Sequence, residues 1–256
     1  DNMEILAPVK NLIGAKAAIQ NGCDAIYLGS PSFSARANAS IDNNELKEII
    51  DYANLYNVKT FIAFNIVIFE DELNKFFKEI DQIYISGASG IIVQDFALIE
   101  LIKQQYPDLE VHCSTQMNIA NLDGIKLVEQ LGSERVVVPR EMKFEQIKHI
   151  KDNTSMPLEV FGHGALCVSY SGQCYDSTLL DQKSANRGRC SQYCRMPQHI
   201  VNKKTGEIIT PTNYPLNLKD LNTINTFNKF KEIGIDSFKI EGRLKGIEYA
   251  SMVTHE

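Results

Sequence analysis

Residues 59–94 read KTFIAFNIVIFEDELNKFFKEIDQIYISGASGIIVQ and contain the unit that recurs through the chain. A short apolar run at 59–64 is followed by a segment of helical periodicity at 70–85 and by a second apolar run at 90–94. Short apolar runs separated by an amphipathic segment of this length predict two parallel strands connected by a helix. The number of such units therefore indicates the fold class.

The same alternation extends outward in both directions. We expect strands at residues 4–7, 25–29, 59–64, 90–94, 110–114, 135–138, 158–161 and 237–241. Between the first seven we expect helices at residues 11–20, 44–55, 70–85, 96–105, 122–131 and 144–151. Eight strands alternating with helices predict an α/β fold, a (β/α)8 TIM-barrel-like domain. An open doubly wound sheet is the alternative, but its glycine fingerprint is broken, because Cys167 stands where GHGALC needs its third glycine.

Composition restricts the class of protein. The chain has 256 residues, a net charge of -6 and 44% hydrophobic residues, which suits a folded globular domain rather than a disordered or fibrous one. No apolar run reaches the ~20 residues of a membrane-spanning helix, and no signal-peptide pattern opens the chain. We therefore expect a cytoplasmic protein with no membrane partner. Six cysteines in such a chain favour metal or redox chemistry over structural disulfides.

The alternation breaks once, from about residue 167 to about 215, after the seventh expected strand. This stretch is rich in Ser, Gly, Asn, Gln and Arg, and has one expected hairpin with arms at 199–201 and 207–210. A long irregular insertion in a compact domain is usually functional, and this one follows a barrel strand on the face where barrel enzymes carry their active sites.

Four cysteines of the insertion predict a metal site. Cys167, Cys174, Cys190 and Cys194 are separated by six, fifteen and three residues. Thiolates in an irregular loop can surround zinc or an iron–sulfur cluster, whereas four buried structural cysteines are a poor match to so polar a loop. The spacing matches neither a zinc ribbon nor a ferredoxin, and proline at residue 197 breaks a radical-SAM pattern.

The insertion is also basic. Between residues 182 and 206 there are six Lys or Arg and no Asp or Glu, namely Lys183, Arg187, Arg189, Arg195, Lys203 and Lys204. These cations either offset thiolate charge and solvate the loop, or bind an anion such as an RNA backbone or a carboxylate. For the second case we single out Arg187, Arg189 and Arg195 as RNA-binding residues.

Polar residues follow most expected strands, at the end where a barrel places its chemistry. They are Ser34, Arg36, Asn65, Gln94, Asp95, Ser114, Gln116, Arg140, Glu141, His163, Glu241 and Arg243. Each alone could be a structural polar group, but their convergence indicates a pocket. Arg36, Arg140 and Arg243 predict that this pocket is cationic and takes a carboxylate or phosphate, with Asn65 and Gln116 as further binding residues.

Several hydrolase classes lack their motifs, since the chain contains no HExxH, no GxSxG and no P-loop. A thiol protease pair of Cys113 with His112 or His163 remains formally open, although no surrounding pattern supports it.

Two blocks of the insertion resemble a known family. The run from Glu159 to Cys174, EVFGHGALCVSYSGQC, is similar to the signature of peptidase family U32, the so-called collagenase-like proteases. The run from Asn186 to Arg195, NRGRCSQYCR, resembles the second block of that family. Shorter matches occur at residues 6–8, 33–38, 114–116 and 237–243, so the resemblance covers nearly the whole chain.

The resemblance implies a barrel and three functions. Family members are known as proteases, as hydroxylases that modify a pyrimidine of tRNA or rRNA using prephenate, and as proteins of ubiquinone synthesis that carry a [4Fe-4S] cluster. A basic loop beside a cysteine cluster suits RNA and a small carboxylate better than peptide hydrolysis. The first hypothesis is therefore an iron–sulfur RNA hydroxylase in which His163 and Glu241 transfer protons. A metal-dependent peptidase and a non-catalytic partner of a second family subunit are the alternatives.

The chain departs from the family pattern in two places. Family members commonly take a fourth cluster cysteine from a KDLC segment, and here residues 219–222 read KDLN with Asn222 in that position. The fourth ligand is then Cys194 or another group, and zinc or no metal stands as the alternative to [4Fe-4S]. Longer members also carry a C-terminal domain, which leads us to expect one barrel domain over residues 1–256 with that domain absent.

Overall fold

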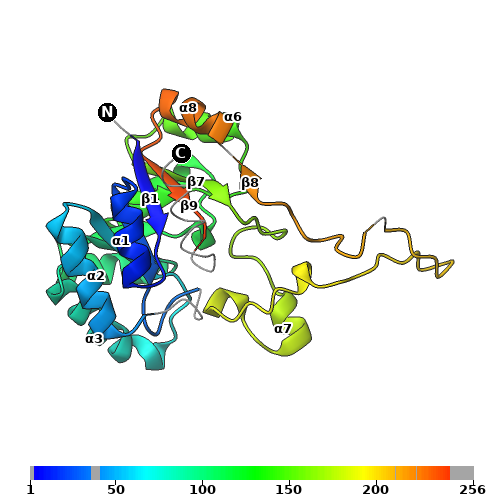
Figure 1. Ribbon diagram of the computed structural model, residues 1–256, viewed down its shortest axis with the longest axis horizontal. Helices are drawn as coiled ribbons and strands as arrows, with labels where there is room; N and C mark the ends of the chain where they lie inside the picture. Colours follow the sequence, from blue (N-terminus) through cyan, green and yellow to red (C-terminus); the bar gives the residue numbers. More distant parts are fainter. Residues whose placement is uncertain (1–2, 36–40, 211, 223, 243–256) are drawn as a thin grey trace.

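Eight parallel strands close into a barrel in the computed structural model, which describes residues 3–35, 41–210, 212–222 and 224–242 (Figure 1). In chain order the strands are β1 Glu4–Pro8, β2 Ala25–Gly29, β3 Lys59–Phe64, β4 Gly90–Val93, β5 Glu110–Cys113, β6 Arg135–Val137, β7 Leu158–Gly164 and β9 Ser237–Ile240. Each strand pairs in parallel with the next, β7 pairs with β9, and β9 returns to β1. The predicted barrel is confirmed, with strand bounds within a few residues of those expected.

Helices connect the strands on the outside of the barrel. They are α1 Leu12–Gln20, α2 Asn43–Leu55, α3 Leu73–Ile85, α4 Phe96–Gln105, α5 Leu122–Gln130, α6 Phe144–Lys151 and α8 Ile224–Glu232. Asparagine or aspartate begins several of them, as when the Asn11 carboxamide accepts a hydrogen bond from the Gly14 amide at 2.8 Å. The helix expected at 70–85 opens as a 3-10 turn, Glu70–Glu72, before α3.

Alternate residues of each strand face two different cores. The larger core lies between strands and helices and contains Ile26, Ile62, Ile91 and Val111. The second is a small separate cluster of Leu6, Ala25, Tyr27, Phe61 and Ile92, whose members alternate with the first set along the same strands. The period of two in a strand places this second cluster inside the barrel.

Charged residues fill the barrel interior at the amino ends of the strands. The Arg135 guanidinium contacts Glu4 at 2.6 Å and Glu159 at 3.1 Å, and the Lys239 ammonium contacts Glu159 at 3.0 Å. Burial alone would raise the pKa of Glu159, but the positive charges of Lys239 and Arg135 outweigh it and lower that pKa to about 2. Glu159 is therefore a buried carboxylate held by two cations.

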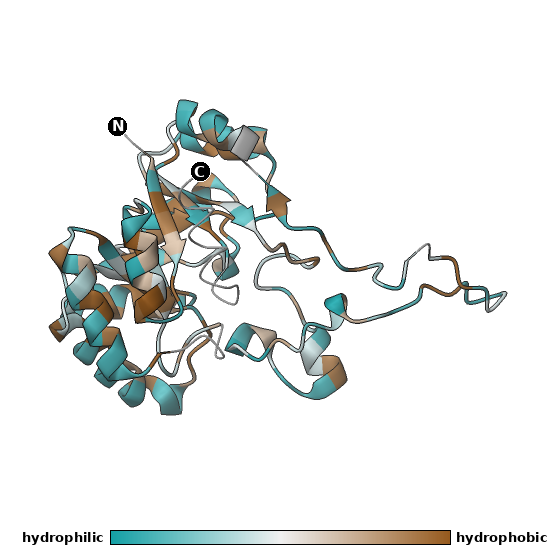
Figure 2. Cartoon of the chain, viewed as in Figure 1, coloured by the Kyte–Doolittle hydropathy of each residue, from teal (hydrophilic) through white to brown (hydrophobic). Residues whose placement is uncertain are grey.

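The insertion after β7 is the irregular part of the fold. It contains α7 Asp176–Asp181, two short 3-10 turns, Ala185–Arg187 and Tyr193–Arg195, and the strand β8 Leu221–Asn222, which runs antiparallel to β7. The expected hairpin is present, because Val201 and Ile208 form an antiparallel bridge. Its arm extends away from the barrel (Figure 1), and apolar colour marks this arm as well as the barrel strands (Figure 2).

In the part of the chain that the structure describes, we find no helix both long enough and apolar enough to cross a lipid bilayer.

Candidate functional site

A pocket opens where the barrel strands end and the insertion begins. Its lining comes from segments that follow β2, β3, β5, β6, β7 and β9, and includes Ala35, Asn65, Ser114, Thr115, Gln116, Arg140, Cys167, Tyr170, Ser171, Cys174, Cys190, Cys194 and Glu241. These segments are far apart in sequence, and the parallel barrel brings their carboxyl ends to one rim. The predicted convergence of Asn65, Gln116, Arg140 and Glu241 is therefore observed.

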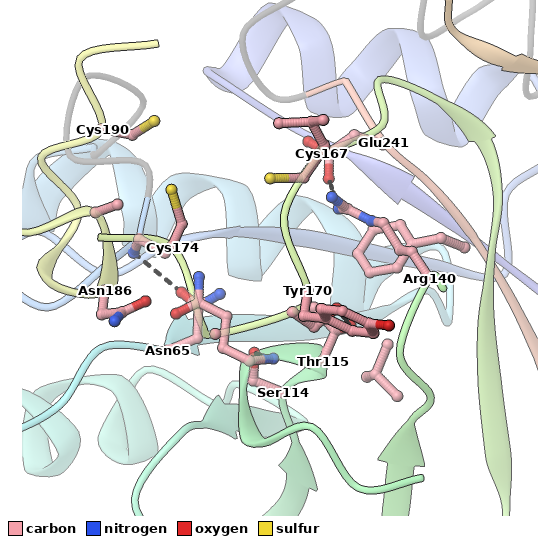
Figure 3. A pocket seen from close by; sticks show the side chains of 18 of the residues that line it. Asn65, Ser114, Thr115, Arg140, Cys167, Tyr170, Cys174, Asn186, Cys190 and Glu241 are labelled. Atoms are coloured by element: carbon pink, nitrogen blue, oxygen red, sulfur yellow. Dashed lines mark hydrogen bonds and ion pairs between the residues drawn. The ribbon is translucent and has the colours of Figure 1, made fainter. Parts of the chain in front are cut away.

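Arg140 and Glu241 form an ion pair inside this pocket. Arg140 Nη2 lies 2.6 Å from Glu241 Oε2, and its guanidinium lies 3.9 Å from the centre of the Phe161 ring (Figure 3). Both side chains are about nine-tenths buried. The pair places a carboxylate and a guanidinium side by side, so Arg140 reaches the pocket with its charge already matched by Glu241.

Lys239 lies deeper in the same pocket and was missed in the sequence. It is 4% exposed, its ammonium lies 4.4 Å from the centre of the Tyr27 ring, and its ion pair with Glu159 joins the pocket to the charged interior. Lys239 lies in the buried strand β9, two residues before Glu241, and both residues line the pocket. A lysine in the middle of a buried strand is unusual, and this signal in the sequence could have identified Lys239.

Amide and hydroxyl groups line the opposite wall. The Asn65 side-chain oxygen accepts a hydrogen bond from the Ala35 amide at 3.0 Å, so that residue holds the loop after β2. Gln116 is part of the 3-10 turn Thr115–Met117 after β5, and its buried Oε1 has no hydrogen-bond partner among the described residues. A buried amide oxygen without a partner is costly unless water or a ligand donates to it, so Gln116 is a candidate binding residue.

All four cysteines of the insertion line the pocket, and all are free thiols. Cys174 and Cys194 are half-buried, whereas Cys167 and Cys190 are exposed. Figure 3 shows Cys174 and Cys190 on one side of the pocket and Cys167 on the side of Arg140. Four unpaired thiols that border one cavity are the donor set that zinc or an iron–sulfur cluster requires.

The pKa values of Cys174 and Cys194 are both raised, in part by the neighbouring cysteines. Burial raises the pKa of Cys194, and the charges of Cys167, Cys190 and Cys174 raise it further while Arg195 opposes them. The pKa of Cys174 is raised by burial and by Asp176, Cys167 and Cys190, against the Asp176 backbone amide. Cys174 and Cys194 thus each lie within electrostatic reach of Cys167 and Cys190. Among the described residues, however, no three His, Cys, Asp or Glu side chains stand in the arrangement that holds one metal ion.

Several predicted site residues lie elsewhere. His163 is in β7, where it pairs with Asn222 of β8 and Ile240 of β9, and it is not among the residues that line the pocket. Arg189 is exposed on the insertion outside the pocket lining. Arg36 and Arg243 lie outside the described residues, so the cationic pocket predicted from them and Arg140 stays a prediction.

Two of the three predicted RNA-binding arginines hold the insertion in place. Arg187 makes a two-pronged contact with Glu72, at 2.6 Å on each nitrogen, and also donates to the Val67 carbonyl. Its hydrogen bonds lower the pKa of Glu72 to about 2, against the opposing effect of burial. Arg195 donates to the Leu166 carbonyl at 3.1 Å and so connects the loop of Cys194 to that of Cys167. RNA binding by these residues stays a prediction.

The remaining cysteines are unsuited to nucleophilic catalysis. Burial raises the pKa of Cys113 to about 12 and that of Cys23 likewise to about 12. The Cys113 thiol donates to Ser133, and burial lowers the pKa of the neighbouring His112, whose ring contacts Glu110 at 2.9 Å. Neither Cys113 nor His112 lines the pocket, so the thiol protease pair lacks both a thiolate and access to substrate.

Comparison with known proteins agrees on one family. Residues 10–256 match the family described as peptidase family U32. The chain is 37% identical to the 23S rRNA 5-hydroxycytidine C2501 synthase of Escherichia coli, over 98% of this chain and 38% of that protein. It is 33% identical to the tRNA hydroxylation protein P1 of Bacillus subtilis, over 98% of this chain and 61% of that protein.

A third relative carries a different name, and one solved structure shares the fold. The chain is 33% identical to a collagenase of Porphyromonas gingivalis, over 99% of this chain and 64% of that protein. It superposes on the structure of the U32 peptidase Mk0906 with a TM-score of 0.63 at 14% identity, covering 94% of this chain and 93% of that one. The chain spans between about two fifths and two thirds of the length of these three curated relatives.

Proposed function

The chain belongs to peptidase family U32, and on that premise we propose that it is part of an iron–sulfur enzyme that hydroxylates a pyrimidine in tRNA or rRNA, with prephenate as oxygen donor. The names of the Escherichia coli and Bacillus subtilis relatives support the reaction. The observation that carries the proposal is one pocket bordered both by four free thiols and by the Arg140–Glu241 pair.

The cysteines support a cluster better than a single ion. A [4Fe-4S] cluster binds each thiolate through a different iron, which spaces the four sulfurs farther apart than four ligands of one zinc. Thiols that share a cavity without converging on one point fit that larger group. When bound, such a cluster would supply electron transfer at the mouth of the barrel.

Cys194 is the fourth ligand in this proposal. Cys167, Cys174 and Cys190 match the family blocks, and Cys194 lines the same pocket. Asn222, which occupies the usual position of the fourth cysteine, lies in β8 opposite His163 and does not line the pocket. Cys194 therefore stands nearer to the chemistry than position 222 does.

The barrel side of the pocket binds the small carboxylate. Arg140 keeps N–H groups that Glu241 does not use and that can donate to a carboxylate, and Gln116 and Asn65 offer amide groups across the pocket. Glu241 holds Arg140 in place at 2.6 Å and is the proton-transfer group nearest to it. His163 does not line the pocket, and its backbone carbonyl accepts a hydrogen bond from the Glu241 amide at 2.8 Å. RNA approaches along the insertion, where Arg189 is exposed.

Mass spectrometry of nucleosides from total RNA tests this function directly. Deletion of the gene should remove one hydroxylated pyrimidine, and the gene with Arg140→Ala should fail to restore it, because the donor carboxylate loses its partner. Glu129→Gln, on the exposed face of α5 and outside the pocket lining, is the control and should restore the modification. An unchanged nucleoside profile, or digestion of gelatin by the purified protein that Cys174→Ser abolishes, would favour the peptidase reading instead.

A further inference from the structure

Three glycines, one at the end of β7 and two in the insertion, stand just before three cysteines of the insertion. Gly164 precedes Cys167 by three residues, while Gly172 precedes Cys174 and Gly188 precedes Cys190 by two residues each. All three have positive φ angles, of 116°, 69° and 81°. Residues other than glycine rarely adopt positive φ angles, because their Cβ atom then crowds the backbone.

Each glycine also rests directly on the backbone of a different barrel strand end. A Cβ on Gly164 would lie 2.4 Å from the Glu241 carbonyl oxygen, after β9. One on Gly172 would lie 2.1 Å from the Gln116 carbonyl oxygen, after β5, and one on Gly188 would lie 2.4 Å from the Ser34 carbonyl oxygen, after β2. A carbonyl of the main chain cannot rotate away as a long side chain can, so each loop would have to lift off the barrel.

We propose that Gly164, Gly172 and Gly188 are positioning residues, which hold Cys167, Cys174 and Cys190 at the pocket by seating their loops on three strand ends of the barrel. This inference deepens the proposed function and rests on it, since the cluster is the group that the three thiols would share. The three contacts come from different sides of the barrel mouth. The insertion is long, mostly exposed and without a buried core of its own. Together the three contacts hold it against the pocket.

The hairpin of the insertion provides a matched control. Gly206 has a φ of +73°, close to those of Gly172 and Gly188, but a Cβ there would meet nothing within 4 Å. Gly206→Ala therefore carries the same backbone strain in the same insertion without the collision. Any difference between Gly206→Ala and the other two alanine variants measures the close approach alone.

The experiment loads the wild-type chain, Gly172→Ala, Gly188→Ala and Gly206→Ala with iron and sulfide under anaerobic conditions. We expect about four irons per chain in the wild type and in Gly206→Ala. Gly172→Ala and Gly188→Ala should bind iron about tenfold less tightly or worse, the size of effect seen when groups that orient metal ligands are lost. Thermal unfolding of each variant, followed by circular dichroism, reports whether the barrel is intact.

A second readout does not depend on the cluster. Phenylarsine oxide bridges neighbouring thiols, so its affinity for the reduced, iron-free chain reports how close the thiols of the insertion lie. We expect that affinity to fall about tenfold in Gly172→Ala and Gly188→Ala and to stay unchanged in Gly206→Ala. If the wild type binds the arsenical in this pattern but takes up no iron, the cluster fails and the positioning role stands.

The opposite result overturns the positioning role alone. If the wild type loads with iron and both alanine variants load equally well, the glycines do not place the thiols, although the cluster stands. If both variants lose the cooperative unfolding of the barrel while Gly206→Ala keeps it, the contacts serve the barrel rather than the cysteines, which also contradicts the proposal.

Discussion

The barrel and the insertion are built by opposite means. Nearly every barrel strand is buried on both faces, so the position of each residue follows from many neighbours at once. In the insertion, exposed apolar residues such as Leu179, Ile200 and Ile209 have no such core, and a few long-range contacts determine the path of the chain. The barrel is thus specified by repetition and the insertion by individual anchors.

This difference separates stability from function. The buried ion pairs of Glu159 with Arg135 and Lys239 belong to the barrel interior, which Lys239 connects to the pocket. The thiols, in contrast, depend on loops that contact the barrel through Arg187, Arg195 and three glycines. Changes in the barrel should therefore alter global unfolding, and changes at the anchors should alter the site while the barrel stays folded.

The largest effect is expected from Glu159→Gln in the barrel. This change leaves Arg135 and Lys239 buried without the carboxylate that both contact, and breaking a buried ion pair from one side costs about 3–5 kcal/mol. Urea unfolding followed by far-UV circular dichroism measures the loss. Glu129→Gln on the exposed face of α5 is the control and should change the unfolding free energy by less than about 0.5 kcal/mol.

The pH dependence of unfolding gives a second, slightly smaller effect at the same residue. The pKa of Glu159 falls from 4.5 to about 2 on folding, so its carboxylate stabilises the fold fully above pH 4.5. That contribution, of about 3 kcal/mol, is lost as the pH falls from 4.5 towards 2. In Glu159→Gln the unfolding free energy should decline less steeply across this interval. If the unfolding free energy depended equally on pH in the two proteins, Arg135 and Lys239 would not lower the pKa of Glu159 on folding.

Periodicity explains why the barrel was predicted so closely. An apolar run such as residues 59–64 predicts a buried strand by itself. The end of each run also predicts where the strand ends, and therefore the positions of Asn65, Gln116, Arg140 and Glu241. The anchors of the insertion are different, because Gly172 rests on Gln116 and Arg187 binds Glu72, 115 positions away. No local pattern encodes such pairs. For the same reason Arg187 reads as a free basic residue in the sequence.

An intermediate effect, confined to the insertion, is expected from Arg187→Ala. The ion pair with Glu72 is about one quarter exposed, so its loss should cost about 1 kcal/mol or less and leave the global unfolding free energy nearly unchanged. Local opening should increase, since the loop before Cys190 loses its anchor. Chymotrypsin cleavage near Leu179, Leu180 and Tyr193 should accelerate about fivefold, which corresponds to that energy.

Arg189→Ala separates the anchor from the charge. It removes the same positive charge two residues later, from an exposed side chain, and should leave the cleavage rate unchanged. Glu72→Gln should reproduce the effect of Arg187→Ala, and the double variant should add little to either. Equal acceleration by Arg187→Ala and Arg189→Ala would mean that net charge, and not the contact with Glu72, holds the loop.

The smallest effect is expected from removing the tip of the hairpin. Val201 and Ile208 form a single antiparallel bridge, and the Ile209 amide donates to the Ile200 carbonyl at 2.9 Å, so two glycines can replace residues 201–208 and close the turn. The side chains of Ile200, Val201, Ile208 and Ile209 are each about half exposed, so little packing is lost. The unfolding free energy should change by less than about 0.5 kcal/mol, and iron uptake should equal that of the full chain. A loss above about 1 kcal/mol would mean that the arm packs on the barrel in solution, and the contrast between the two regions would then no longer hold.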